Sequence, residues 1–347
     1  MKVKERILAT LHWEEPDRVP LTVYDWQLPR GIAERHLREI GVGLVMRLPA
    51  HRVEHRQVRF TSEEYWEQGR RLIRKTIQTP VGEAWQILDP QAAYDSTWVL
   101  EHFIKGPADY RVMEFMIGDA VYHDNYEAIR EAQRRLGDDG LVYVRVAKAP
   151  IQEMIYHMLG IEQFSIDYYE RRELIDSLNH VMLERYRELF DLTAGSPVEV
   201  VTLADNITSD VVGRERFRTY VMPVYKLLKE SISSTGKLLG VHMDGRLNSL
   251  VKEIGEANID FVEALTPPPM GDVSVREARA AWPGKGLWLN FTSCMHVESP
   301  EVIAIHTRQL LEEAGSKRGF AMGVTEDAPV EALERSLAVI ARVLNDF

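Results

Sequence analysis

Segments typical of strands and of helices alternate along the chain from Gly140 to its end, and this alternation constrains the fold more than any other feature. Short β-branched or apolar runs are each followed by a longer stretch with apolar residues at helical spacing. The expected strands span 141–146, 198–203, 237–242, 259–264, 287–291 and 319–323. The expected helices span 151–159, 172–192, 215–233, 247–257, 275–282, 300–314 and 330–344. Strands joined through helices in one sheet must pair in parallel.

Two architectures accommodate a series of such units: a closed barrel and a doubly wound open sheet. A dinucleotide-binding open sheet carries a glycine-rich phosphate fingerprint after its first strand. No such fingerprint follows any of the expected strands. We therefore predict an α/β fold, a (β/α)8 TIM barrel.

The first 140 residues are less regular. Residues 18–25 predict a first barrel strand, and residues 57–60, 70–78 and 82–88 predict an antiparallel β-meander with a turn at 79–82. No flexible linker marks a boundary between this N-terminal elaboration and the barrel. We expect a single domain spanning 1–347, with an antiparallel insertion at about residues 50–100.

Composition excludes several classes of function. The 347 residues contain 42 Lys and Arg against 53 Asp and Glu, a formal net charge of −11, which disfavours binding to nucleic acid or to an anionic membrane. No apolar run approaches the roughly 20 residues that cross a bilayer, and the N-terminus lacks the apolar core of a signal peptide. One cysteine, Cys294, allows neither an intramolecular disulfide nor a cysteine-rich zinc site. A cytoplasmic protein is expected.

Polar residues end nearly every expected strand, which is where parallel α/β barrels carry their functional groups. This recurrence is more informative than any single residue. The candidates include Tyr24, Asp25, Trp26 and Arg30 after the first strand, then Asp205 and Asn206, His242 and Asp244, Glu263, Asn290, and Glu326 after the last strand.

His242, Asp244 and Glu263 form the sharpest of these groups. A histidine at a strand end, with a carboxylate two positions later and another at the end of the next strand, suits a divalent metal or an acid–base group. The alternative is that His242 is a buried, hydrogen-bonded core residue and that Asp244 belongs to a turn before Gly245. For Asp205 and Asn206, substrate binding and capping of a helix or turn remain open alternatives.

Several segments together resemble one family. They are ERILATLHWEEPDRVP, TPVGEAW, LADNITSDVVGRERFRTYVMPVYKLL, GVHMDGRLNSLVKEIGEANIDFVEAL and GFAMGVTEDAPVEALERSLAVI. Their order and spacing resemble the uroporphyrinogen decarboxylase superfamily, which includes the decarboxylase of haem synthesis and cobamide-dependent methyltransferases. The resemblance covers essentially the whole chain. It implies a (β/α)8 barrel with its site at the C-terminal mouth, and a homodimer.

The sequence also departs from that family. The decarboxylases carry an arginine-rich loop of the form RQAGRYLPEY after the first strand, whereas this chain has YDWQLPRG. The zinc methyltransferases carry His-x-Cys and a later cysteine, whereas this chain has His242-Met243-Asp244 and no second cysteine. Glu263 matches an acidic zinc ligand of the family. The resemblance thus implies a metal set of His242, Glu263 and Asp244, whose oxygen ligands suit zinc, manganese or iron(II).

These observations together predict an enzyme of this superfamily acting on a small metabolite. The expected reaction is methyl transfer linked to a corrinoid on a partner protein, with a divalent metal as an optional aid. The expected catalytic residues are His242, Asp205 and Asp25, and the expected substrate-binding residues are Arg30, Trp26, Asn206, Asn290 and Glu326. The alternatives are decarboxylation of uroporphyrinogen III and a non-catalytic barrel that binds a tetrapyrrole or another small ligand.

Overall fold

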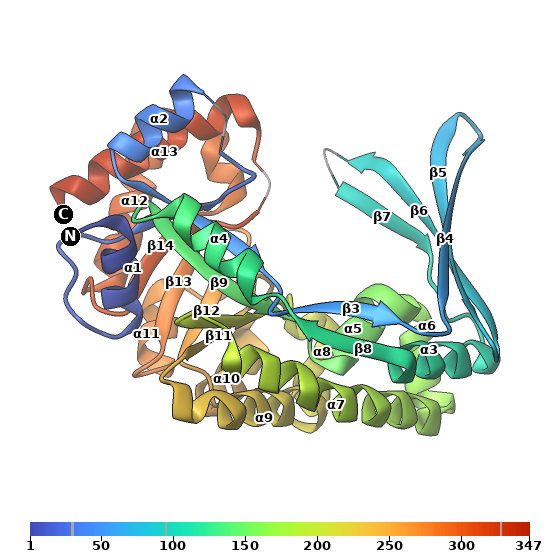
Figure 1. The fold of residues 1–347 in the computed structure, drawn as a ribbon. Coiled ribbons are helices and arrows are strands. Elements are labelled where there is room, and N and C mark those ends of the chain that lie inside the picture. The colour runs from blue at the N-terminus through green and yellow to red at the C-terminus, as the bar shows by residue number, and fades with distance from the viewer. Residues whose placement is uncertain (29–30, 94–95, 327) are drawn as a thin grey trace. The chain divides into compact units, whose positions relative to one another are not determined.

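The computed structural model describes residues 1–28, 31–93, 96–326 and 328–347, which form two compact units (Figure 1). The first unit comprises residues 1–50, 125–147 and 193–347, and the second comprises residues 51–124 and 148–192. None of the described helices is long and apolar enough to cross a membrane.

The first unit contains a closed barrel of parallel strands, which confirms the predicted fold class. Around the barrel the order is β1-β14-β13-β12-β11-β10-β9-β2. The strands are β1 (Leu21–Tyr24), β2 (Val42–Leu48), β9 (Gly140–Val146), β10 (Val200–Leu203), β11 (Leu238–His242), β12 (Phe261–Leu265), β13 (Gly286–Asn290) and β14 (Phe320–Val324). The sequence pattern predicted every one of these strands except β2.

Helices connect most of the barrel strands. The connecting helices of this unit include α2 (Ile32–Glu39), α4 (Tyr126–Leu136), α8 (Ser209–Arg216), α9 (Met222–Ile232), α10 (Val251–Glu256), α11 (Val275–Ala281) and α12 (Pro300–Ala314). Helix α1 (Val3–Leu11) precedes the first strand, and α13 (Val330–Asp346) follows the last. The helix expected at 215–233 is divided, because a π-helical turn (Phe217–Val221) separates α8 from α9. Helix α12 has its expected bounds: the Ser299 hydroxyl accepts a hydrogen bond from the Val302 amide, and Gly315 ends the helix in the left-handed conformation.

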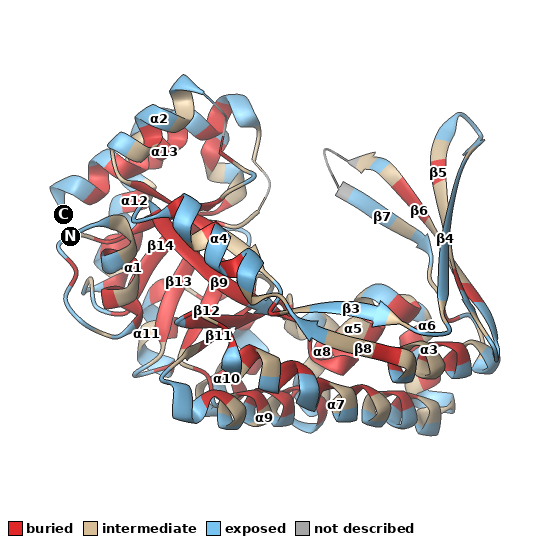
Figure 2. Cartoon of the chain, viewed as in Figure 1, coloured by how far each residue is buried: buried red, intermediate tan, exposed pale blue. Residues whose placement is uncertain are grey.

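Inward-facing apolar residues of the strands fill the barrel, and α1 closes the end at which the strands begin. Figure 2 shows the barrel strands as almost continuously buried. The amide of Lys4 donates to the carbonyl of Asp138 just before β9, and Ile7 and Leu11 join the barrel core. The opposite end, where the strands terminate, remains as the mouth.

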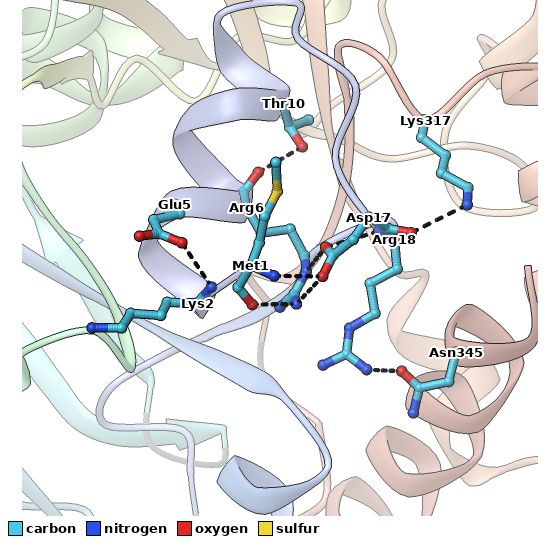
Figure 3. A network of polar contacts seen from close by, with 9 residues as sticks. All are labelled: Met1, Lys2, Glu5, Arg6, Thr10, Asp17, Arg18, Lys317 and Asn345. Carbon is cyan, nitrogen blue, oxygen red and sulfur yellow. Dashed lines mark hydrogen bonds and ion pairs between the residues drawn. The ribbon is translucent and has the colours of Figure 1, made fainter.

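A polar network holds the segment between α1 and β1 in place (Figure 3). The buried Arg6 guanidinium donates from Nε to Asp17 Oδ1 at 2.6 Å and from a terminal nitrogen to Asp17 Oδ2 at 2.9 Å. Its hydrogen bonds hold the pKa of the Asp17 carboxyl far below its usual value. The neighbouring Arg18 donates to Asn345 of α13. Asp17 of the N-terminal motif therefore anchors α1, and Arg18 contacts α13.

The second unit is built on antiparallel strands, as expected for the meander. One sheet has the order β4-β5-β6-β7, and β3 pairs with β8. The strands are β3 (His51–His55), β4 (Arg59–Glu67), β5 (Arg70–Thr79), β6 (Gly82–Ala93), β7 (Ser96–Glu101) and β8 (Ala120–Asp124). The unit extends beyond the expected insertion at about 50–100, because it also includes α3 (Pro107–Asp119), α5 (Pro150–Glu153), the π-helix Met154–Leu159, α6 (Gly160–Glu170) and most of α7 (Arg172–Gly195).

Gly240 gives the barrel interior a testable packing constraint. A Cβ atom at Gly240 would lie 2.2 Å from ring carbons of Phe261 on the neighbouring strand β12. We expect Gly240→Ala to destabilise the protein by about 1–3 kcal/mol, since a ring packed inside the barrel has little room to move. The urea midpoint measures this. Gly118→Ala is the control, because no heavy atom lies within 4 Å of that Cβ position in α3. A wild-type midpoint for Gly240→Ala would contradict the prediction.

Candidate functional site

Side chains from neighbouring strands converge at the mouth of the barrel. His242 is the last residue of β11 and is the register partner of Glu263 in β12, so the two side chains lie next to each other. Tyr24 ends β1 and is buried with them. Parallel strands place their carboxyl ends at one rim, which brings together residues far apart in the sequence.

These residues and Asp244 form one hydrogen-bonded chain. The Tyr24 hydroxyl donates to Glu263 Oε1 at 2.5 Å, and Glu263 Oε2 is hydrogen-bonded to His242 Nδ1. On the other side of the imidazole ring, Nε2 lies 3.3 Å from Asp244 Oδ2. The Glu263 side chain is only 3% exposed, whereas the Asp244 side chain is 24% exposed. The chain therefore runs from the barrel interior to solvent.

The hydrogen-bonded chain determines which of its side chains are charged. Burial by itself would lower the pKa of His242, but the charge of Glu263 and the hydrogen bonds that the ring donates to Asp244 and Glu263 raise it to about 9. Burial opposes ionisation of Glu263, yet the charge and hydrogen bond of His242 hold its pKa below the usual value. Burial and the nearby Glu263 charge raise the pKa of Tyr24 well above its usual value. At neutral pH the chain holds an imidazolium between carboxylates.

Unusual backbone geometry supports this arrangement. Ala264, directly after Glu263, has a left-handed φ of 64°, and the register between β12 and β13 shifts between Glu263 and Leu265. Such a bulge changes the direction of a side chain at a strand end. The amide of Met243 donates to the carbonyl of Glu263 at 2.9 Å, which ties the two strand ends together. Left-handed residues other than glycine are strained and are concentrated at functional sites.

The geometry of the histidine ring bears on the metal that the family resemblance implies. Glu263 and Asp244 occupy different ring nitrogens, which point to opposite sides of the imidazole. The three side chains therefore form a linear chain and do not converge on one ion. Within the described ranges, no three His, Cys, Asp or Glu side chains are grouped as metal ligands. The residues as arranged do not fit a metal held by His242, Glu263 and Asp244 together.

Two arginines lie at the mouth that the sequence analysis did not single out. The guanidinium carbon of Arg47 lies 3.7 Å from the ring centre of Tyr24 and 4.3 Å from that of Trp26. Trp26 is 52% exposed and stacks on Tyr24, with ring centres 4.7 Å apart. Burial lowers the pKa of Arg145, and the charge of Arg47 lowers it further. Each arginine interrupts an apolar strand two residues after an inward-facing position, which is the sequence signal that could have identified them.

Two of the predicted site residues, Asp205 and Asn290, form hydrogen bonds within the protein that stabilise the segments after the strands. Asp205 is buried and accepts a hydrogen bond from the Tyr225 hydroxyl at 2.6 Å. Asn290 donates to the hydroxyl of Thr266 at 3.2 Å and accepts from the amide of Thr325 at 2.9 Å.

The remaining predicted residues follow other strands of the barrel. Glu326 accepts a hydrogen bond from Ser293 at 2.5 Å. Asp25 is half-buried in the turn after β1, and Asn206, with a left-handed φ of 52°, follows β10. Arg30 lies outside the described residues. Asp205, Asn290 and Glu326 thus have protein partners, whereas Trp26 presents its ring to solvent.

A variant at Tyr225 tests whether Asp205 has this anchoring role. We expect Tyr225→Phe to lower the free energy of unfolding by about 1–3 kcal/mol, because a buried carboxylate loses a donor. Turnover per folded molecule should stay close to the wild-type value. Tyr169→Phe serves as the control, since Tyr169 is 91% exposed. Unchanged stability together with a loss of turnover would instead place Asp205 in catalysis.

Comparisons with known proteins agree with the fold. The family model described as uroporphyrinogen decarboxylase (URO-D) matches residues 96–343, most of the chain. No curated protein matches the sequence. Among solved structures, a methyltransferase from Methanosarcina mazei is 14% identical with a TM-score of 0.59, and the match covers 99% of each chain. At this identity the likeness establishes a shared fold.

Two further solved structures have lower TM-scores. A putative vitamin-B12-independent methionine synthase from Listeria monocytogenes is 15% identical with a TM-score of 0.42, over 65% of this chain and 69% of that one. A pneumococcal exo-β-D-N-acetylglucosaminidase is 10% identical with a TM-score of 0.44, over 95% of this chain and 85% of the other. No argument rests on either likeness.

Proposed function

The chain belongs to the uroporphyrinogen decarboxylase (URO-D) family, and from this premise we propose that it transfers a methyl group from a small methylated metabolite to a corrinoid carried by another protein. The observation that carries the proposal is the position of His242 at the barrel mouth between Glu263 and Asp244, whose charges raise its pKa to about 9 and so favour the protonated ring. The Methanosarcina methyltransferase shares the fold over nearly the full length of both chains, which is consistent with the proposal.

Removing a methyl group from oxygen or nitrogen requires a proton donor. The bond between the methyl carbon and the heteroatom breaks with both electrons remaining on the heteroatom, which is then a poor leaving group unless it gains a proton. In this proposal the corrinoid is a substrate on a separate protein and supplies the nucleophile that accepts the methyl group. A positioned general acid commonly contributes about 10²–10⁴-fold to the rate of such a step.

His242 is suited to deliver that proton from Nε2. Its Nδ1 is held by the buried Glu263, whose other oxygen is held by Tyr24. Nε2 faces the partly exposed Asp244 at 3.3 Å, where a substrate atom can compete for the proton. After donation, the neutral imidazole regains a proton from solvent, and the Glu263 carboxylate favours that return. Trp26 and Arg47 form a wall of the mouth beside this chain.

Decarboxylation is a second candidate, favoured by the two mouth arginines. A guanidinium can hold a substrate carboxylate, and His242 can protonate the carbon from which carbon dioxide departs. Uroporphyrinogen itself carries eight carboxylates, and this chain lacks the RQAGRYLPEY loop of the decarboxylases. A substrate with fewer carboxylates suits this mouth better.

One assay with two readouts separates these reactions. The purified protein is incubated with reduced cobalamin as the methyl acceptor and a panel of methyl ethers and methylamines. Demethylated products are followed by mass spectrometry. In parallel, carbon dioxide release is measured from uroporphyrinogen and from smaller aromatic and aliphatic carboxylates. Demethylation supports the proposal, and carbon dioxide release without demethylation supports the second candidate. If neither product forms, both proposed reactions are overturned, and the remaining alternative is a barrel that only binds a ligand.

A further inference from the structure

We propose that Arg47 and Arg145 together bind a carboxylate of the substrate, next to an aromatic platform formed by Tyr24 and Trp26. The inference rests on the proposed function for the statement that the bound molecule is the methyl donor. Beyond the proposed function, it specifies the chemical class of the methyl donor, which is a planar ring bearing a carboxylate.

The strand register places the two arginines together. Arg47 in β2 is the register partner of Tyr143 in the neighbouring strand β9. Arg145 follows Tyr143 by two positions, so it extends from the same face of β9 and lies nearer the strand end. Tyr143 belongs to the barrel core, so this face points into the barrel. Arg145 lies at the end of that inward row, where part of its side chain reaches solvent while the surrounding protein still partly desolvates the guanidinium.

No acid in the part of the chain that the structure describes pairs directly with either of these two arginines. Among the described residues, neither guanidinium forms a hydrogen bond or a salt bridge, and Arg47 contacts the faces of two rings instead. The buried Arg6, by contrast, is paired with Asp17 at 2.6 Å. The charge of Arg47 favours ionisation of the buried Glu263, but the oxygens of Glu263 are already hydrogen-bonded to His242 and Tyr24.

The two neighbouring guanidinium groups repel each other: burial lowers the pKa of Arg145 most, the charge of Arg47 lowers it further, and the charge of Glu263 offsets this only in part. A ligand carboxylate would relieve this repulsion, because its two oxygens accept hydrogen bonds from the planar guanidinium groups. The chain as a whole is negatively charged, with a formal net charge of −11. Selectivity for an anion at the mouth therefore has to come from local cations.

The platform indicates what the carboxylate is attached to. Trp26 lies nearly parallel to Tyr24, with 20° between the ring planes, and is 52% exposed. A half-exposed indole at a barrel mouth offers a flat apolar surface on which a planar ring can stack. Arg47 lies over both rings, so a carboxylate bound by Arg47 would bring an attached ring alongside the platform.

Calorimetric titration with benzoate and benzamide tests the site, since the two compounds have the same ring and nearly the same shape but differ in charge. At low salt we expect benzoate to bind the wild-type protein at least about tenfold more tightly than benzamide, the effect of one charge-assisted contact. Arg47→Gln and Arg145→Gln should each remove that preference. The control Arg318→Gln should retain it, because Arg318 is exposed and pairs with Glu15 away from the mouth.

Several outcomes would overturn the site. Equal binding of the two compounds, binding of neither at millimolar concentration, or full benzoate selectivity in both arginine variants would each do so. Arg145→Gln changes an exposed side chain and should keep the wild-type melting temperature, so its result does not depend on folding. The titration contains no methyl acceptor. A protein that selects benzoate through both arginines but transfers no methyl group would keep this site and lose the proposed reaction.

Discussion

Replacing His242 with asparagine is expected to lower kcat by about 10²–10⁴-fold, the range for loss of a positioned general acid. Asparagine can still donate one hydrogen bond toward Glu263, but it carries no titratable proton. Steady-state kinetics of the reaction found in the two-readout assay measure the effect. KM should change much less than kcat, because the proton is transferred in the transition state and contributes little to binding of the ground state.

Two controls separate loss of the proton donor from loss of structure. His12→Asn alters an exposed histidine directly after α1, at the other end of the barrel, and should leave kcat unchanged. Added imidazole should restore part of the activity of His242→Asn if only the proton donor is missing. A kcat within tenfold of the wild-type value in a folded His242→Asn protein would show that the proton comes from another group.

The barrel could be predicted from the sequence because its strands and helices follow local patterns. Glycine, serine and proline gave the bounds of α12 correctly, through the cap at Ser299 and the left-handed Gly315. Strand β2 could not be predicted in this way. Two glycines, Gly41 and Gly43, flank its first residue, and Arg47 interrupts its apolar pattern. Pairing with β1 and β9 defines this strand, and such partners are not local in sequence.

The candidate site, like the fold, combines residues that local sequence rules predict with residues that only the pairing of distant strands brings together. The rule that functional groups follow strand ends identified His242, Asp244 and Glu263, which the structure brings into one chain. It also selected Tyr24 at the end of β1, but assigned it no role. A tyrosine in an apolar strand is indistinguishable from a core residue until the strand opposite is known. Arg47 and Arg145 were missed for the related reason that they lie within strands, where barrel closure makes them neighbours.

The second prediction with a large effect concerns the pKa of His242, which follows from its place in the hydrogen-bonded chain between Glu263 and Asp244. Glu263→Gln keeps the size of the side chain and a hydrogen-bonding oxygen, but removes the negative charge that outweighs burial of the imidazole. We expect the pKa of His242 to fall well below the wild-type value of about 9, since burial then opposes the charged form and only Asp244 favours it. NMR titration of histidine-labelled protein measures this directly. His296 is the internal reference, because burial lowers its pKa to about 4 and its Nδ1 is bonded to Ser336.

The same substitution changes how stability depends on pH. A pKa raised in the folded state means that the stabilisation from protonated His242 is complete below its unfolded value, near 6.5, and is lost as pH rises through about 9. The lowered pKa of Glu263 gives a contribution that is complete above about 4.5 and is lost as pH falls. Melting temperatures of the wild type should therefore decline between about pH 6.5 and 9, and Glu263→Gln should abolish most of that decline. A His242 pKa still near 9 in Glu263→Gln would show that Asp244 alone keeps the imidazole charged, and the buried carboxylate would then lose its role in the proposed proton transfer.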